Sequence, residues 1–260
     1  MCRPTRSQRL TGPGTGGSRT AVVAGGAARA AGTVVRDKIV AIAAHSMEAD
    51  PSDLDVRDGV VSVRGTPARS MTIGDVAALA YRFADQLAPE MEAGLEATVR
   101  FRPARFPTWS NATHLCVVEV DADTCVPRVV RYIVSEDCGR MINPSVVEGQ
   151  IFGGVVQGIG GVLLEDFVYD ENGNPLTTTF MDYLLPTTTE VPTIEIGHIE
   201  TDSTTNPGGY KGMGEGGAIG AHAAVANAVG DALAHLGIHV NSTPLGPNDI
   251  HALMVAAGHA

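Results

Sequence analysis

The spacing of apolar residues along the chain predicts three long helices. Within residues 27–48, Val35, Ile39 and Ile42 recur every three or four positions, which is typical of a helix with one buried face. Residues 146–164 repeat this spacing despite several glycines, and we expect those glycines to allow close packing against another backbone. A third helix is expected over residues 218–236, interrupted only by Gly220 and Gly230.

Shorter segments alternate apolar and polar residues and predict strands. A hairpin is expected over residues 54–63 around Asp58 and Gly59, followed by a short helix that begins with a capping box of Thr72 and Asp75. Three further runs, residues 97–101, 114–120 and 129–134, are expected to form an antiparallel sheet. Strands of this kind beside long helices predict an α+β fold, in which antiparallel sheet segments pack against the helices.

Composition and charge narrow the classes of function. The 260 residues are 44% hydrophobic and 18% charged, which is typical of a globular protein. A net charge of -11 argues against binding to nucleic acid or to an anionic membrane surface. No run of apolar residues is long enough to suggest membrane insertion, and no apolar stretch follows the arginines near the start. We therefore expect a cytoplasmic protein.

The cysteines and histidines do not predict a metal centre held by the protein. Cys2, Cys116, Cys125 and Cys138 show no Cys-x-x-Cys spacing, so neither structural zinc nor an iron–sulfur cluster is indicated on this chain. The eight histidines include no His-Glu-x-x-His pair.

The most informative segment for chemistry is the glycine-rich run 206–220, because it holds a single lysine, Lys211, and a single glutamate, Glu215. Backbone at such a loop can approach a ligand closely, and a carboxylate in a poorly hydrated pocket can serve as a base. The alternative is a surface ion pair between these two residues. The spacing of Gly212, Gly214 and Gly217 also matches a dinucleotide fingerprint, but no buried strand precedes it, so nicotinamide binding is disfavoured.

Two other segments suit polar contacts. Residues 14–20, Gly-Thr-Gly-Gly-Ser-Arg-Thr, offer backbone N–H groups, hydroxyls and a guanidinium to an oxyanion or phosphate. Residues 147–158 place Gln150 and Gln157 seven positions apart, on one helix face. The alternatives are a solvated tail for the first segment and a glycine-packed helix with two half-buried amides for the second.

Taken together, these segments resemble the C-terminal molybdopterin-binding region of the molybdenum hydroxylases, the family of xanthine dehydrogenase, aldehyde oxidase and the large subunit of carbon monoxide dehydrogenase. The resemblance covers roughly residues 12–255, in matching order and spacing. It rests on GTGGSRT at 14–20, HLCVVEVDADT at 114–124, DCGRMINPSVVEGQIFGGVVQGIG at 137–160, MDYLLPT at 181–187 and NPGGYKGMGEGGAIGAHAAVANAVGDAL at 206–233.

The resemblance implies an oxidoreductase component that oxidises or hydroxylates an aldehyde, an N-heterocycle or a similar small substrate with water-derived oxygen. It implies that Glu215 is the catalytic base and that Gln150 and Lys211 contact the cofactor or shape its pocket. The glycine loop would hold the cofactor through Thr15, Gly17, Ser18, Arg19 and Thr20. The cofactor implied is molybdenum–molybdopterin in its cytosine dinucleotide form, and because its dithiolene holds the metal, no protein ligand to the metal is expected.

The resemblance also implies partners, because large subunits of this family are considerably longer than this chain. We expect residues 1–11 to be an unmatched tail and residues 12–260 to be the cofactor-binding region, divided into two subdomains at about 12–110 and 111–260. The rest of the large subunit, and subunits carrying iron–sulfur clusters and FAD, would complete the enzyme. The rival hypothesis is a truncated, catalytically silent fragment or a non-catalytic binding domain. The substrate itself cannot be read from these residues.

Overall fold

The computed structural model describes residues 14–103 and 109–259. The chain divides into two compact units: a larger one made of Met1–Val22 and Ala104–Ala260, and a smaller one made of Val23–Pro103. Each unit has its own hydrophobic core, and the two are described separately.

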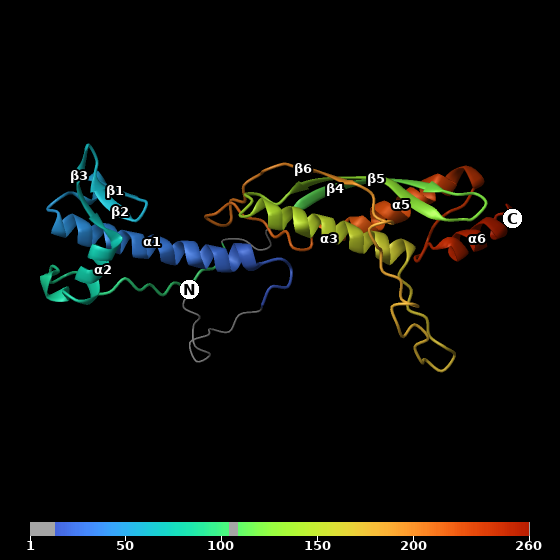
Figure 1. The fold of residues 1–260 in the computed structure, drawn as a ribbon, viewed down its shortest axis with the longest axis horizontal. Helices are drawn as coiled ribbons and strands as arrows, with labels where there is room; N and C mark the ends of the chain where they lie inside the picture. The colour runs from blue at the N-terminus through green and yellow to red at the C-terminus, as the bar shows by residue number, and fades with distance from the viewer. Residues whose placement is uncertain (1–13, 104–108, 260) are drawn as a thin grey trace. The chain divides into compact units, whose positions relative to one another are not determined.

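The smaller unit packs a three-stranded antiparallel sheet against helices (Figure 1). Its core joins Ile42 and Ala43 of the long helix to Val61 and Val76, all of which are buried. The elements in chain order are α1 (Thr20–Ser46), which belongs to this unit from Val23 onward, η2 (Pro51–Asp53), β1 (Leu54–Arg57), β2 (Val60–Val63), β3 (Thr66–Thr72), α2 (Ile73–Tyr81) and η3 (Ala84–Gln86).

Local signals in this unit predicted its first hairpin and the start of α2. The hairpin between β1 and β2 is confirmed, and its turn places Asp58 and Gly59 at positive φ, as a two-residue hairpin turn requires. The capping box at the start of α2 is also confirmed, since Thr72 and Asp75 each bond the other's backbone N–H. Strand β3 was not predicted, because its residues are almost all exposed and do not alternate.

The strand predicted at residues 97–101 is wrong, because the segment forms no strand. The ring of Phe101 instead lies where a side chain at Gly26 would be, with its Cζ 2.6 Å from the position of a Cβ there. Phe101 of this segment therefore packs against α1 at Gly26.

The larger unit combines a three-stranded sheet with helices, which confirms the α+β class (Figure 1). Strands β4 and β5 pair antiparallel as predicted, but the third strand, β6, lies parallel to β5 and comes much later in the chain. The elements are β4 (Asn111–Val120), β5 (Pro127–Asp137), α3 (Pro144–Leu163), β6 (Ile194–His198), α4 (Gly216–Ile219), α5 (Ala221–Leu233), η4 (Ala234–Leu236) and α6 (Pro247–Ala256).

Helix α3 is the centre of this core. Ile151, Val155 and Ile159 repeat every four residues and are buried, in the same cluster as Tyr132 of β5 and Val225 of α5. By length and composition α3 is also apolar enough to cross a membrane, although no such helix was expected from the sequence. The buried core helix of a globular protein meets the same criterion.

The glycines of α3 allow the close packing predicted for them. A Cβ at Gly154 would overlap the backbone of Gly217, and one at Gly158 would overlap Ala221. In return, a Cβ at Gly217 would lie 2.7 Å from the Cα of Ile151. Helix α3 and the start of α4 therefore meet backbone to backbone, which brings the loop before α4 next to α3.

The helix predicted over residues 218–236 is divided into α4, α5 and η4. The division falls at Gly220, where a Cβ would lie 2.6 Å from Cδ2 of His114 on β4. A glycine is thus required where the chain passes over the sheet.

Candidate functional site

Three segments that the sequence singled out meet at one cavity of about 630 Å³ in the larger unit. The glycine loop and the start of α1 contribute Thr15, Ser18 and Thr20, and α3 contributes Gln150. The loop before α4 contributes Lys211 and Glu215. Six of the eight predicted site residues therefore line a single cavity. Gly17 and Arg19 do not.

The glycine loop turns tightly before α1 begins. Gly14, Gly17 and Ser18 all have positive φ, at 78°, 71° and 54°. Arg19 is committed to its own loop, since its Nε donates to the carbonyl oxygen of Gly16 at 2.5 Å. The loop thus brings hydroxyls and backbone to the cavity, while the guanidinium closes the turn.

The loop 206–215 is held in shape by Asn206, a buried side chain. Its Oδ1 accepts from the N–H groups of Gly208 and Tyr210, and its Nδ2 donates to the carbonyl of Tyr210 at 2.8 Å. The N–H of Lys211 then donates to the carbonyl of Cys138 at 2.9 Å, which joins the loop to the end of β5.

Lys211 forms a salt bridge with Asp137 and not with Glu215. Its Nζ lies 2.8 Å from Oδ2 of Asp137, and both side chains are nearly buried. Burial alone would raise the pKa of Asp137, but hydrogen bonds from Lys211 and from the N–H groups of Gly139 and Thr201 outweigh it and lower the pKa to about 2. This ion pair anchors the loop that carries Glu215.

Glu215 stands at the start of α4, on the rim of the cavity. Its backbone N–H donates to Oγ of Ser18 at 3.1 Å, across 197 positions of sequence. Its side chain is exposed, so the poorly hydrated surroundings expected for it are not formed by the described residues. The carboxylate is placed next to the cavity but is not enclosed there.

Gln150 lines the cavity together with the glycine loop. A Cβ at Gly214 would be 3.5 Å from Oγ of Ser18 and 3.8 Å from Oε1 of Gln150, so three segments converge at this glycine. Gln157, predicted on the same helix face, does not line the cavity.

Sequence reasoning missed part of the cavity wall, which comes from the turn between β5 and α3. Its signal was the segment DCGRMINP at 137–144, quoted for the resemblance but assigned no role. A Cβ at Gly139, whose φ is 64°, would overlap the carbonyl of Gly209, so this turn and the loop 206–215 touch. Additional lining residues there are Cys138, Arg140, Met141 and Asn143.

A buried carboxyl, that of Glu136, lies beneath the same loop. It is 1% exposed, and neither of its oxygens meets a hydrogen-bond partner among the described residues. A Cβ at Gly216 would be 2.7 Å from its Oε1. Burial is the main cause that raises the pKa of Glu136, with the charge of Asp137 adding to it, and the nearby Ser110 hydroxyl and Lys211 offset only part of the rise.

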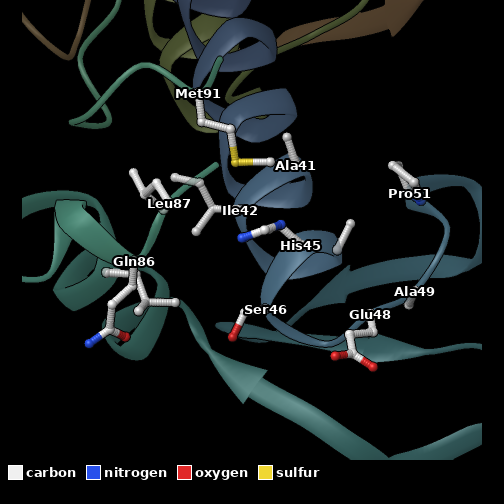
Figure 2. A pocket seen from close by; sticks show the side chains of 12 residues that line it. Ala41, Ile42, His45, Ser46, Glu48, Ala49, Pro51, Gln86, Leu87 and Met91 are labelled. Atoms are coloured by element: carbon white, nitrogen blue, oxygen red, sulfur yellow. The ribbon is translucent and has the colours of Figure 1, made fainter. Parts of the chain in front are cut away.

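Neither metal-ligand chemistry nor the second cavity points to another site. Within residues 14–103 and 109–259, no group of three or more His, Cys, Asp and Glu side chains could hold a metal ion. The smaller unit has its own cavity of about 640 Å³, where Ile42 and His45 of α1 face Leu87 and Met91 (Figure 2). Its lining is mostly apolar and contains none of the glycine-rich motifs.

Comparison with known proteins identifies the family to which the chain is similar. Residues 4–192 match the family model of the molybdopterin cofactor-binding domain. The large subunit of nicotine 6-hydroxylase from Paenarthrobacter nicotinovorans is 44% identical over 95% of the chain and 30% of that protein. The carbon monoxide dehydrogenase large chain of Hydrogenophaga pseudoflava is 38% identical over 87% of the chain and 28% of that protein.

A solved structure shows the same fold. The crystal structure of quinoline 2-oxidoreductase from Pseudomonas putida 86 superimposes with a TM-score of 0.88 at 43% identity, covering 96% of this chain and 32% of that one. The chain thus spans about a third or less of the length of the proteins it matches.

Proposed function

Because the chain belongs to the molybdopterin cofactor-binding domain family of the molybdenum hydroxylases, we propose that its larger unit holds a molybdenum–molybdopterin cofactor with Glu215 beside the reaction centre. The observation that carries this proposal is the convergence of Thr15, Ser18, Gln150 and Glu215 on one cavity. Residues 12–260 together would form the cofactor-binding region of a longer large subunit.

The groups at the cavity suit such a cofactor. A pterin presents ring nitrogens and a carbonyl, which hydrogen-bond well to an amide such as that of Gln150. Hydroxyls and turn N–H groups of residues 14–20 suit phosphate oxygens. Gly139 and Gly212 let the turn 137–144, the loop 206–215 and Ser18 approach one another closely beside the cavity. When bound, the cofactor would supply the metal and the redox chemistry that accepts electrons from the substrate.

The same loop supports a dinucleotide form of the cofactor, and the resemblance implies that the nucleotide is cytosine. Thr15 and Thr20 line the cavity, and a loop of this kind matches a diphosphate better than a single phosphate because it offers several donors in succession. We therefore favour the cytosine dinucleotide form.

Glu215 would act as a general base. Its exposed carboxylate can accept the proton of the water-derived oxygen that enters the product, while Ser18 and the Lys211–Asp137 ion pair hold its loop. Walls that exclude water from this carboxylate would come from the remainder of the large subunit. Iron–sulfur and flavin subunits would then carry the electrons away, and an aldehyde, an N-heterocycle or a similar small molecule would be the substrate.

The test is molybdenum content and turnover. The chain is purified from its native host with whatever it binds, and metal is measured by elemental mass spectrometry beside dye reduction with aldehydes and N-heterocycles. In the variant Glu215→Gln, molybdenum is expected to remain near one per chain while kcat falls by at least about a hundredfold, which is the usual scale for loss of a general base.

Two results would contradict the proposal. A chain without molybdenum in its native complex would make it a silent binding domain. Turnover that survives Glu215→Gln at full molybdenum content would remove Glu215 from the chemistry while leaving cofactor binding intact.

A further inference from the structure

We propose that Ser18 is the positioning residue of Glu215, in that its hydroxyl oxygen holds the Glu215 backbone N–H and thereby sets where the carboxylate meets the cavity. The inference rests on the proposed function, because it assigns a role toward Glu215 as the base. It differs from the role of direct cofactor contact that the resemblance implies for Ser18.

The backbone of Ser18 adopts a conformation that favours glycine. Its φ of 54° lies in the left-handed region, where any residue with a Cβ is strained and glycine is favoured. Glycines occupy both of the preceding positions, 16 and 17, and Gly17 shares this conformation. A serine in this conformation carries backbone strain, which the hydrogen bond made by its hydroxyl offsets.

The hydroxyl has a specific task in the structure. Its Oγ accepts a hydrogen bond from the N–H of Glu215 at 3.1 Å. This N–H lies at the start of α4, where backbone donors have no partner within the helix. Ser18 is also the point where the two loops touch, since a Cβ at Gly212 would lie 2.6 Å from the Ser18 carbonyl oxygen and 2.9 Å from its Cβ. The two loops are therefore joined at Ser18 on one side and at Gly212 and Glu215 on the other.

This arrangement couples cofactor binding to the base. A hydroxyl has one hydrogen to donate besides its acceptor lone pairs, so Ser18 can accept from Glu215 and still donate into the cavity. A ligand that orders residues 14–18 would then order Glu215 through the same oxygen. Lys211 and Asp137 secure the loop at its other side, which leaves Ser18 to determine the position of its end.

The first test uses the chain without cofactor and follows hydrogen exchange of the Glu215 amide by NMR. In Ser18→Gly the strain is relieved and the acceptor is lost, so exchange at Glu215 should accelerate by roughly tenfold. Ser18→Asn tolerates the left-handed backbone and offers a carbonyl oxygen, so it should restore slow exchange. The control is Asp58→Gly, which relieves a left-handed residue in the hairpin of the smaller unit and should leave Glu215 unchanged.

The second test uses the loaded enzyme and separates positioning from binding. In Ser18→Gly, kcat per bound molybdenum should fall roughly tenfold while KM stays within about twofold, and Ser18→Asn should recover most of kcat. Unchanged exchange at Glu215 in Ser18→Gly, or equal acceleration in Asp58→Gly, overturns the inference. Absence of molybdenum from the wild-type complex overturns the proposed function instead and leaves the exchange result standing.

Discussion

At the scale of single residues, the Asp137–Lys211 ion pair makes stability depend on pH. The pKa of Asp137 is lowered to about 2 in the folded chain, whereas an unfolded aspartate titrates near its ordinary value of about 4. A lowered pKa means that the pair contributes fully above about pH 4 and that this contribution is lost as pH falls towards 2. Removing the pair should therefore matter at neutral pH and much less in acid.

Asp137→Asn is expected to lower the free energy of unfolding by about 2 kcal/mol at pH 7, because it leaves the Lys211 ammonium nearly buried without a counter-charge. Urea denaturation at pH 7 and pH 3 measures this loss and its decline. The matched control is Glu119→Gln, which breaks the exposed pair with Arg128 and should change stability by less than about 0.5 kcal/mol. An equal loss in both variants, or a loss independent of pH, contradicts the assignment.

Residue types at the site could be predicted from sequence, but their partners could not. Ser18, Gln150 and Glu215 stand in segments whose composition already suggested a ligand. The Lys211–Asp137 pair depends on which face of β5 Glu136 and Asp137 each take. Glu136 points into the interior and Asp137, one position on, faces the loop, and a one-residue shift of the strand would exchange them.

At the scale of elements, the contact between α3 and α4 sets the position of the Glu215 loop, and two adjacent glycines test it. A Cβ at Gly154 would overlap the backbone of Gly217 and Ala218, whereas a Cβ at Gly153 would meet nothing within 4 Å. Gly154→Ala should therefore destabilise the chain by about 1 to 3 kcal/mol through overpacking. Gly153→Ala should stabilise it by up to about 1 kcal/mol, since alanine favours helix.

Thermal unfolding of both variants beside the wild type measures the difference. Because the two changes are chemically identical and lie in the same helix, propensity cannot explain opposite signs. If both variants gain stability, the close approach of α3 to α4 is wrong, and with it the placement of Gln150 near Gly214.

The elements that were predicted correctly are specified by residues close together in the sequence. The errors concern strands whose partners lie far away in the sequence. The hairpin at Asp58 and the cap at Thr72 need only neighbouring residues. Strand β6 pairs with β5 across more than fifty residues of sequence, and its short sequence does not indicate which strand it pairs with. Residues 97–101 form no strand, and Phe101 packs against Gly26 instead.

At the scale of the whole molecule, the segment between α3 and β6 exposes apolar side chains that the described residues do not cover. In Figure 1 this loop projects from the end of α3. Phe180 and Met181 are 81% and 88% exposed, and Leu184 and Leu185 are about half exposed. Apolar side chains gathered in this way mark an interaction surface. On the proposed function, in which the chain belongs to a longer large subunit, we expect the rest of that subunit to cover this segment.

The double variant Phe180→Ser, Met181→Ser tests that expectation. These side chains have few contacts within the chain, so its own stability should change by less than about 0.5 kcal/mol. Binding to a chain that carries the remainder of the large subunit should weaken at least about a hundredfold, because burial of each side chain contributes about 1.5 to 3 kcal/mol. Val255→Ser on α6, also exposed, is the control and should alter binding less than about threefold. Binding is measured by titration calorimetry at fixed salt. If the double variant binds as tightly as the wild type, the contact lies elsewhere, and if Val255→Ser weakens binding as much as the double variant, the effect is not specific to this segment. A loss confined to the double variant identifies the segment as the docking surface.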